Sequence, residues 1–355
     1  MVSPWSVSRP RRVLIVKPSS LGDIVTALPV LRGLRRTFPE AHIAWLLSTP
    51  FAPMIEGDGD LDEIIPFERK ALGRAWRSSR GMAKLATLLR TLRRGEFDWT
   101  IDLQGLTRSA LLGQVTGAPV RAGFANAPEA LASRFYTHRL KPVSVHTADR
   151  NIELARALGV DARPEDMSLT LSEAGRRFAE AFCRGRNIPA RGFVICVPPT
   201  RGKPKLYPVR HWRKVVSALA ASTSVVLLGA PSERELCGQV AKGLSPRVID
   251  LSGQTTLPEM IGIIDASAGV ICSESAAKFI AAALGVGAIT LIGPNRSDMT
   301  GPYLSGRAIT ADVPCQGCLR HKSGCRHATC MELIDPNEVI RAGRAMLAAT
   351  ARGDT

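Results

Sequence analysis

The side chains best suited to chemistry follow apolar runs that predict β-strands. The first run is Arg12–Val16, and a helix is predicted to begin near Asp23. Between them lie a cation and the small residues of a tight turn: Lys17, Ser19, Ser20 and Gly22. A carboxylate in the place of Asp23 either caps the helix, for about 1 kcal/mol, or takes a proton from a bound substrate. The residues by themselves leave both roles open.

A basic loop follows the predicted strand Phe193–Val197. It supplies a hydroxyl, a guanidinium and two ammonium groups before the next helix: Thr200, Arg201, Lys203 and Lys205. Such groups suit a bound diphosphate, although a basic surface loop has the same composition. Two carboxylates follow later strands. Glu233 comes after Ser224–Leu228, where the helix dipole alone favours an acid, and Glu274 comes after Ala268–Cys272.

A cysteine cluster near the carboxyl end has the spacing C-x2-C-x6-C-x4-C. It comprises Cys315, Cys318, Cys325 and Cys330. Thiolates at this density suit a tetrahedral zinc or iron ion of structural character. Unligated thiols are the alternative, and structural disulfides are a weaker explanation in a reducing cytoplasm.

The elements that must position these residues alternate between strand and helix in both halves of the chain. This alternation predicts an α/β fold with parallel sheets covered on both faces. We expect two Rossmann-like, doubly wound domains facing across a cleft, residues 1–165 and 192–355, joined by a linker region at 166–191. Ligands of such sheets bind outside the carboxyl ends of the strands, where the candidate residues are predicted to lie.

Charge and hydropathy limit the partners. The 355 residues carry 47 Lys and Arg against 31 Asp and Glu, for a net charge of +16, so the chain should bind anions. Residues 69–94 contain nine of the cations, no acid and interleaved leucines, which predicts a basic amphipathic helix. It suits anionic lipid headgroups, and a solvated helix face is the alternative. No nucleic-acid module, membrane span or signal peptide is recognisable, so we expect a cytoplasmic protein at the inner-membrane surface.

The motifs of the first half resemble those of the ADP-heptose:lipopolysaccharide heptosyltransferases, which are GT-B glycosyltransferases of family 9. Residues 17–29 read K-x-S-S-L-G-D-x-x-x-x-L-P, residues 102–109 read D-L-Q-G-L-T-R-S, and Arg121-Ala-Gly-Phe and His146…Arg150-Asn151 follow in order. The resemblance implies that Asp23 is the catalytic base. It implies an acceptor-binding first domain that uses Lys17, Ser19, Ser20, Gly22, Gln104, Arg108 and Arg121.

The second half is similar to the donor-binding motifs of the same family. Residues 200–208 resemble T-x-R-x-x-K-x-W-P, with Lys205 as the matching lysine and Lys203 as its rival, and Glu233 matches the ribose-binding acid. The sugar and diphosphate turn of the family, D-[TS]-G-x-x-H, is replaced by Glu274-Ser275-Ala276-Ala277-Lys278-Phe279. Glu274, Ser275, Ala276 and Lys278 are therefore candidate donor-binding residues that depart from the pattern.

The resemblance implies an inverting transfer of heptose from ADP-heptose to a phosphorylated lipid A or core acceptor, either Kdo–lipid A or a heptosyl group. No cofactor is expected for catalysis. A cysteine cluster in some relatives resembles a metal finger beside the donor site. Two alternatives stay open: a transferase with another nucleotide sugar or a protein acceptor, and a non-catalytic member with a degenerate donor site.

Overall fold

The computed structural model describes residues 5–68, 78–319, 325 and 328–352. Its contacts divide the chain into two units, Met1–Met167 and Ser168–Thr355. Each unit contains one parallel six-stranded sheet, in the orders β3-β2-β1-β4-β5-β6 and β12-β11-β10-β7-β8-β9. The predicted α/β fold with two Rossmann-like sheets is therefore confirmed.

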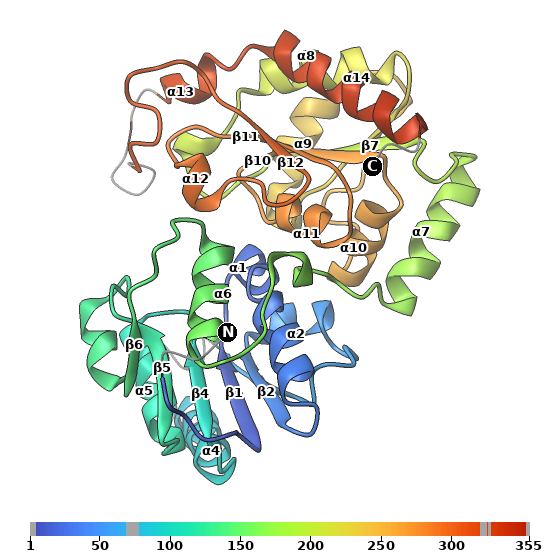
Figure 1. The fold of residues 1–355 in the computed structure, drawn as a ribbon. Coiled ribbons are helices and arrows are strands. Elements are labelled where there is room, and N and C mark those ends of the chain that lie inside the picture. Colours follow the sequence, from blue (N-terminus) through green and yellow to red (C-terminus); the bar gives the residue numbers. More distant parts are fainter. Residues whose placement is uncertain (1–4, 69–77, 320–324, 326–327, 353–355) are drawn as a thin grey trace. The chain divides into compact units, whose positions relative to one another are not determined.

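The first unit alternates strands and helices along the whole of its length (Figure 1). Its strands are β1 (Arg12–Val16), β2 (His42–Leu47), β3 (Glu63–Pro66), β4 (Trp99–Asp102), β5 (Val120–Phe124) and β6 (His138–Leu140). Its helices are α1 (Leu21–Val25), α2 (Leu28–Thr37), α4 (Ser79–Arg94), α5 (Thr107–Thr116) and α6 (Thr147–Ala157), with short 3-10 turns η1 (Thr49–Met54), η3 (Ala130–Phe135) and η4 (Pro164–Asp166). Residues 21–38 carry helical periodicity, which suits a single helix that begins near Asp23. The chain forms two instead, because Pro29 has no N–H to continue the first helix and fits the first turn of a new one.

Helices cover both faces of the first sheet. Alternate residues of β1 and β2, such as Leu14 and Leu46, pack against Leu88 and Leu92 of α4. Helix α4 begins at the N-cap Ser78, whose hydroxyl accepts from the Gly81 N–H, and the rest of the predicted basic helix, 69–77, lies outside the described residues.

The second unit repeats the scheme. Its strands are β7 (Phe193–Val197), β8 (Ser224–Leu227), β9 (Val248–Asp250), β10 (Gly269–Ser273), β11 (Ala288–Leu291) and β12 (Gly306–Ile309). Its helices are α7 (Glu173–Arg186), α8 (Val209–Ala220), α9 (Arg234–Ala241), α10 (Leu257–Asp265), α11 (Ala277–Ala283), α12 (Ser297–Thr300), α13 (Thr329–Glu332) and α14 (Pro336–Arg352), with turns η5 (Lys203–Lys205) and η6 (Pro231–Glu233).

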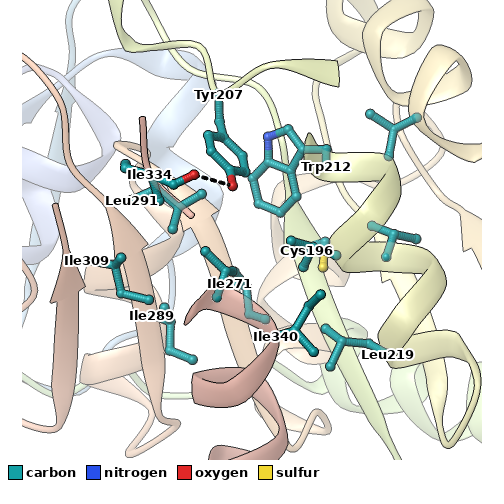
Figure 2. Close-up of a cluster of buried hydrophobic side chains, with 14 of the residues drawn as sticks. Cys196, Tyr207, Trp212, Leu219, Ile271, Ile289, Leu291, Ile309, Ile334 and Ile340 are labelled. Carbon is teal, nitrogen blue, oxygen red and sulfur yellow. Dashed lines mark hydrogen bonds between the residues drawn. The ribbon is translucent and has the colours of Figure 1, made fainter. Parts of the chain in front are cut away.

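One face of the second sheet forms the core shown in Figure 2. Trp212 of α8 is fully buried and packs edge-on to Tyr207, with ring centroids 5.6 Å apart. The Tyr207 hydroxyl donates to the Ile334 carbonyl at 3.0 Å, which ties the segment before α8 to the chain before α14. Tyr207, which stands where the family pattern has Trp, is thus a core residue.

The predicted linker region 166–191 contains a helix that belongs to the second unit. Helix α7 packs on α10 through two glycines, and a Cβ placed on Gly262 would lie 2.1 Å from the Gly175 carbonyl oxygen. No side chain fits at that crossing, so the pair allows the two helix backbones to touch.

Candidate active site

The candidate residues gather at the switch point of each sheet. In the first unit, strand order runs in opposite directions from β1 and β4, and in the second from β7 and β10. Loops that follow the two central strands diverge there and leave a crevice at the carboxyl ends. Asp23 and Gln104 follow β1 and β4, whereas Thr200 and Glu274 follow β7 and β10.

Asp23 is the third residue of α1, and Ser20 is the N-cap. The Ser20 N–H and hydroxyl both donate to Asp23 Oδ2, at 2.8 and 2.7 Å. The other oxygen, Oδ1, lies 3.9 Å from Lys17 Nζ, and 38% of the Asp23 side chain is exposed. Asp23 therefore stabilises the helix start with one oxygen and presents the other at the carboxyl end of β1. The two roles that the sequence left open are compatible.

A buried carboxylate, Asp102, organises the loop after β4. It accepts four hydrogen bonds, from the Gln104 and Gly105 N–H groups and from the Ser109 and Tyr136 hydroxyls, at 2.7–3.1 Å. Burial raises the pKa of Asp102, and these four donors oppose the rise. Gly123 makes room for the tyrosine, since a Cβ there would lie 2.3 Å from the ring. The D-x-Q-G-x-x-R-S motif is thus the internal frame of this loop.

Four of the predicted acceptor residues meet around this loop. Lys17 is buried and donates to the Leu103 carbonyl at 2.7 Å, which joins the ends of β1 and β4. Ser19, Gln104 and Arg108 line a small open pocket, with Pro18, Phe67, Leu106, Ser109 and Leu112. The Gln104 Oε1 atom is buried without a hydrogen-bond partner among the described residues. Ser20 and Gly22 shape the adjoining turn.

Arg121 is not brought to this pocket. Its guanidinium donates to the Phe135 carbonyl at 3.0 Å and to the Ala118 carbonyl at 2.7 Å. Ala118 precedes β5, so the side chain points toward the amino end of the strand. Arg121 acts here as a brace for the η3 segment, which differs from the acceptor role that the resemblance implied.

The second unit places two lysines around a buried glutamate. The Glu274 side chain is 2% exposed, and its Oε2 lies 3.9 Å from Lys205 Nζ. Neither carboxylate oxygen has a hydrogen-bond partner of normal geometry among the described residues. Burial raises the pKa of Glu274, while the positive charges of Lys205 and Lys278 and the amide of Asn295 oppose the rise. Lys203 is exposed and is not part of this group, so of the two rival lysines only Lys205 reaches Glu274.

The departures from the family pattern in residues 274–279 have local explanations. Ala276 has φ −64° and ψ −21°, an ordinary helical conformation, so no glycine is required there. Phe279 is buried, and its ring centroid lies 4.9 Å from Lys278 Nζ. The ring and the ammonium group therefore form a cation–π pair where the pattern has histidine.

The remaining donor candidates are less concentrated. The Thr200 hydroxyl donates to the Glu274 carbonyl at 2.6 Å, so its proton bridges the loops after β7 and β10. Ser275 Oγ accepts from the N–H of Ala277, the first residue of α11, at 3.3 Å. Glu233 accepts from the Ala230 N–H at 2.7 Å in the turn after β8, and Arg201 is exposed.

The four clustered cysteines are free thiols that differ in exposure, from exposed Cys315 to buried Cys330. Burial raises the pKa of Cys330, and the charges of the other three cysteines raise it further, so the thiols lie near one another. Within the described ranges, no three His, Cys, Asp or Glu side chains are arranged to hold a metal ion. The metal therefore stays a prediction.

Helix α4 carries an exposed basic face, with Arg80, Lys84, Arg90, Arg93 and Arg94 all open to solvent. Over the residues that the structure describes, no helix has the length and apolar character needed to cross a bilayer.

Of two further residues of the first site, the sequence did not point to Tyr136 and gave Asn151 only as part of a motif, without a role. Tyr136 reaches Asp102 from 34 residues away, and Asn151 donates to the Thr26 carbonyl at the end of α1 at 3.0 Å. Position after a strand marks neither residue. Only the packing of η3 and α6 against the sheet brings them to the carboxyl end.

Comparison with known proteins supports the same chemistry. Residues 85–329 match the family described as glycosyltransferase family 9 (heptosyltransferase). The chain is 28% identical to lipopolysaccharide heptosyltransferase 1 of Pseudomonas aeruginosa, over 87% of this chain and 86% of the relative. It is 27% identical to the Escherichia coli K12 protein of that name, over 82% and 91%. The solved structure of the E. coli heptosyltransferase WaaC with ADP superposes with a TM-score of 0.75 at 25% identity, over 94% of this chain and 99% of that one.

Proposed function

The chain belongs to glycosyltransferase family 9, the heptosyltransferases, and from that premise we propose that it transfers heptose from ADP-heptose to an inner-core acceptor of lipopolysaccharide. The acceptor we propose is Kdo–lipid A or a heptose already attached to it. Relatives named as lipopolysaccharide heptosyltransferases support this acceptor class, and the ADP in the similar solved structure supports the nucleotide.

The observation that carries the proposal is the difference in hydrogen bonding between the two oxygens of the Asp23 carboxylate. Oδ2 accepts both hydrogen bonds from Ser20, whereas Oδ1 accepts none within the described chain, and the side chain as a whole is partly exposed. Oriented by one oxygen and open at the other, the group has what a general base needs.

The proposed reaction is a single displacement with inversion. The acceptor hydroxyl attacks the anomeric carbon of the heptose, its proton passes to Asp23 Oδ1, and the bond between the sugar and the β-phosphate breaks. ADP leaves with the bonding electron pair. Lys205 and Lys278 offset the charge that develops on it, without a metal ion, and Glu233 binds the ribose hydroxyls.

A transfer assay tests this function directly. Radiolabelled ADP-heptose is supplied with defined truncated lipopolysaccharides, and product is followed by label in the lipid. Transfer to at least one acceptor is expected. Because Glu274, Ala276 and Phe279 depart from the family pattern, a panel of ADP and UDP sugars runs beside it. If nucleotide is released only from another sugar donor, that sugar replaces heptose in the proposed function. If calorimetry detects no binding of ADP, a non-catalytic protein is favoured.

We propose further that the enzyme binds peripherally to the cytoplasmic surface of the inner membrane through the basic face of α4. The cations of this helix suit anionic headgroups, which attract each nearby Lys or Arg by about 1 kcal/mol. Flotation with vesicles is the test. Binding to vesicles with anionic lipid, lost on replacing Arg90, Arg93 and Arg94 by Gln, is expected, and equal binding to neutral vesicles would contradict it.

The cysteine cluster completes the proposal as a structural zinc or iron site. The spacing of four cysteines within 16 residues supports it. Elemental analysis of purified protein should give about one equivalent of metal. Less than roughly a tenth of an equivalent of both metals would end this part of the proposal.

A further inference from the structure

Arg150 is a half-buried cation near the carboxyl end of the first sheet. It lies in the first turn of α6, and its guanidinium carbon is 5.0 Å from the ring centroid of Phe124, the last residue of β5. The ring is itself buried and forms a cation–π pair with the guanidinium. The Arg150 side chain therefore lies at the carboxyl end of the first sheet, the same end at which Asp23 and Gln104 lie.

The positive charge of Arg150 lacks a matching carboxylate. Its Nη2 donates to the neutral amide oxygen of Asn126 at 3.1 Å, and no described acid forms an ion pair with it. Glu153 is the acid that acts on it electrostatically, but the Glu153 carboxylate accepts from the Val143 and Ser144 N–H groups at 2.7 and 2.8 Å. Burial accordingly lowers the pKa of Arg150.

Arg32 provides the contrast within the same unit. It is also largely buried, but two carboxylates, Asp58 and Asp60, pair with it, and its pKa is raised. A desolvated cation without such partners is costly and is typical of a group that awaits an anionic ligand.

Arg150 is also tied to the helix that carries Asp23. The next residue, Asn151, is buried and donates from Nδ2 to the Thr26 carbonyl at 3.0 Å. Thr26 is the C-cap of α1, a helix of only 5 residues that contains Asp23. An anion bound at Arg150 would therefore be held at a fixed separation from the Asp23 carboxylate.

We propose that Arg150 binds an anionic group of the acceptor, a sugar-acid carboxylate or a phosphate, and thereby places the acceptor hydroxyl against Asp23. The inference rests on the proposed function. A guanidinium offers two parallel N–H groups to either anion, and the Asn126 amide keeps that fork in place. Arg150 is thus an acceptor-binding residue, distinct from the base.

The test measures steady-state kinetics of heptose transfer with three acceptors: Kdo–lipid A, the same glycolipid with its sugar-acid carboxylates reduced to alcohols, and the dephosphorylated glycolipid. Arg150→Gln should raise the KM for Kdo–lipid A by roughly tenfold to a hundredfold, the usual loss for a charge-assisted hydrogen bond. Its KM for ADP-heptose should change less than about threefold. Wild type should lose affinity for one of the two modified acceptors, which identifies the anion, and Arg150→Gln should no longer distinguish that acceptor from the parent.

Two further variants serve as a conservative replacement and as a control. Arg150→Lys retains the charge without the fork, should give an intermediate KM, and carries the test if the Gln variant fails to melt cooperatively. Arg134→Gln removes an exposed arginine of η3 and should behave as wild type. If wild type transfers heptose but Arg150→Gln keeps the parental acceptor KM, the inference is wrong. If wild type transfers no heptose to any acceptor, the proposed function fails instead.

Discussion

Each unit buries one carboxylate beyond the end of a central strand, and the two have opposite surroundings. Asp102, at the end of β4, accepts four hydrogen bonds and is tied to two hydroxyls and two backbone N–H groups. Glu274, just after β10, is almost as deeply buried, yet it faces Lys205 and Lys278 without a hydrogen bond of normal geometry. The four donors to Asp102 belong to the folded loop itself. Glu274 instead lies beside two lysines whose positive charges oppose the rise of its pKa, and its oxygens accept no hydrogen bond of normal geometry from the described residues.

The difference separates a framework residue from a binding residue. A buried acid whose acceptor sites are filled contributes to stability and has no capacity left for a ligand. A buried acid whose oxygens accept no hydrogen bond of normal geometry from the described residues keeps acceptor capacity for the hydroxyls of an arriving sugar diphosphate. Asp23 lies between these extremes, since one of its oxygens is filled and the other is open.

Replacing Asp102 should produce the largest effect. Asp102→Ala leaves the Tyr136 hydroxyl and two N–H groups without an acceptor, at about 1–3 kcal/mol each, while the Ser109 hydroxyl keeps the Leu106 carbonyl. We expect the free energy of unfolding in urea to fall by about 4 kcal/mol or more. Glu274→Gln is the matched comparison at the other sheet and should change it by less than about 1 kcal/mol. Equal losses in both variants would remove the distinction between the two carboxylates.

Removing the open carboxylate should affect turnover more than stability. Asp23→Ala is expected to reduce kcat for heptose transfer by at least about two orders of magnitude, the usual contribution of a general base. The loss of the two hydrogen bonds from Ser20 should cost about 1 kcal/mol of stability, measured by thermal melting. A folded variant with near-normal turnover would exclude Asp23 as the base.

A smaller effect is expected at Arg121, whose hydrogen bonds also indicate a role in stability. Because its guanidinium braces two carbonyls, Arg121→Lys should lower the free energy of unfolding by about 1–2 kcal/mol. The KM for the acceptor should stay within about twofold of wild type. A rise in that KM with unchanged stability would restore the acceptor role that the sequence resemblance implied.

The smallest expected effect is the contribution of Glu274 to the pH dependence of the free energy of unfolding. Burial raises the pKa of Glu274 in the folded protein, so the folded state holds this proton more tightly than the unfolded chain does. Its contribution to the free energy of unfolding is therefore lost as the pH rises from the unfolded value, about 4.3, through the raised folded value. The stability of wild type minus that of Glu274→Gln should decrease over this window in urea titrations. A constant difference would show that the carboxyl titrates normally.

Strand-end residues were the part of the site that the sequence could predict. Apolar runs located most strands, and the rule that ligands bind at carboxyl ends then pointed to Asp23, Thr200 and Glu274. Strand β5 and the edge strands β6 and β12 were missed, because short strands of mixed composition give no clear alternation. The placement of Arg121 away from the pocket could not be predicted for a related reason, since the direction of its side chain depends on the register of β5.

The sequence by itself determined the fold class, the motif order and the residue types at the strand ends, because these follow from local periodicity and short-range turns. Only the tertiary structure decided which charges are neutralised. Lys205 rather than Lys203 reaches Glu274, Tyr136 fills the last acceptor site of Asp102, and Arg150 is left without a carboxylate. Electrostatic pairing acts over a few ångströms between residues that are distant in the chain, so packing has to bring the partners together before their roles can be assigned.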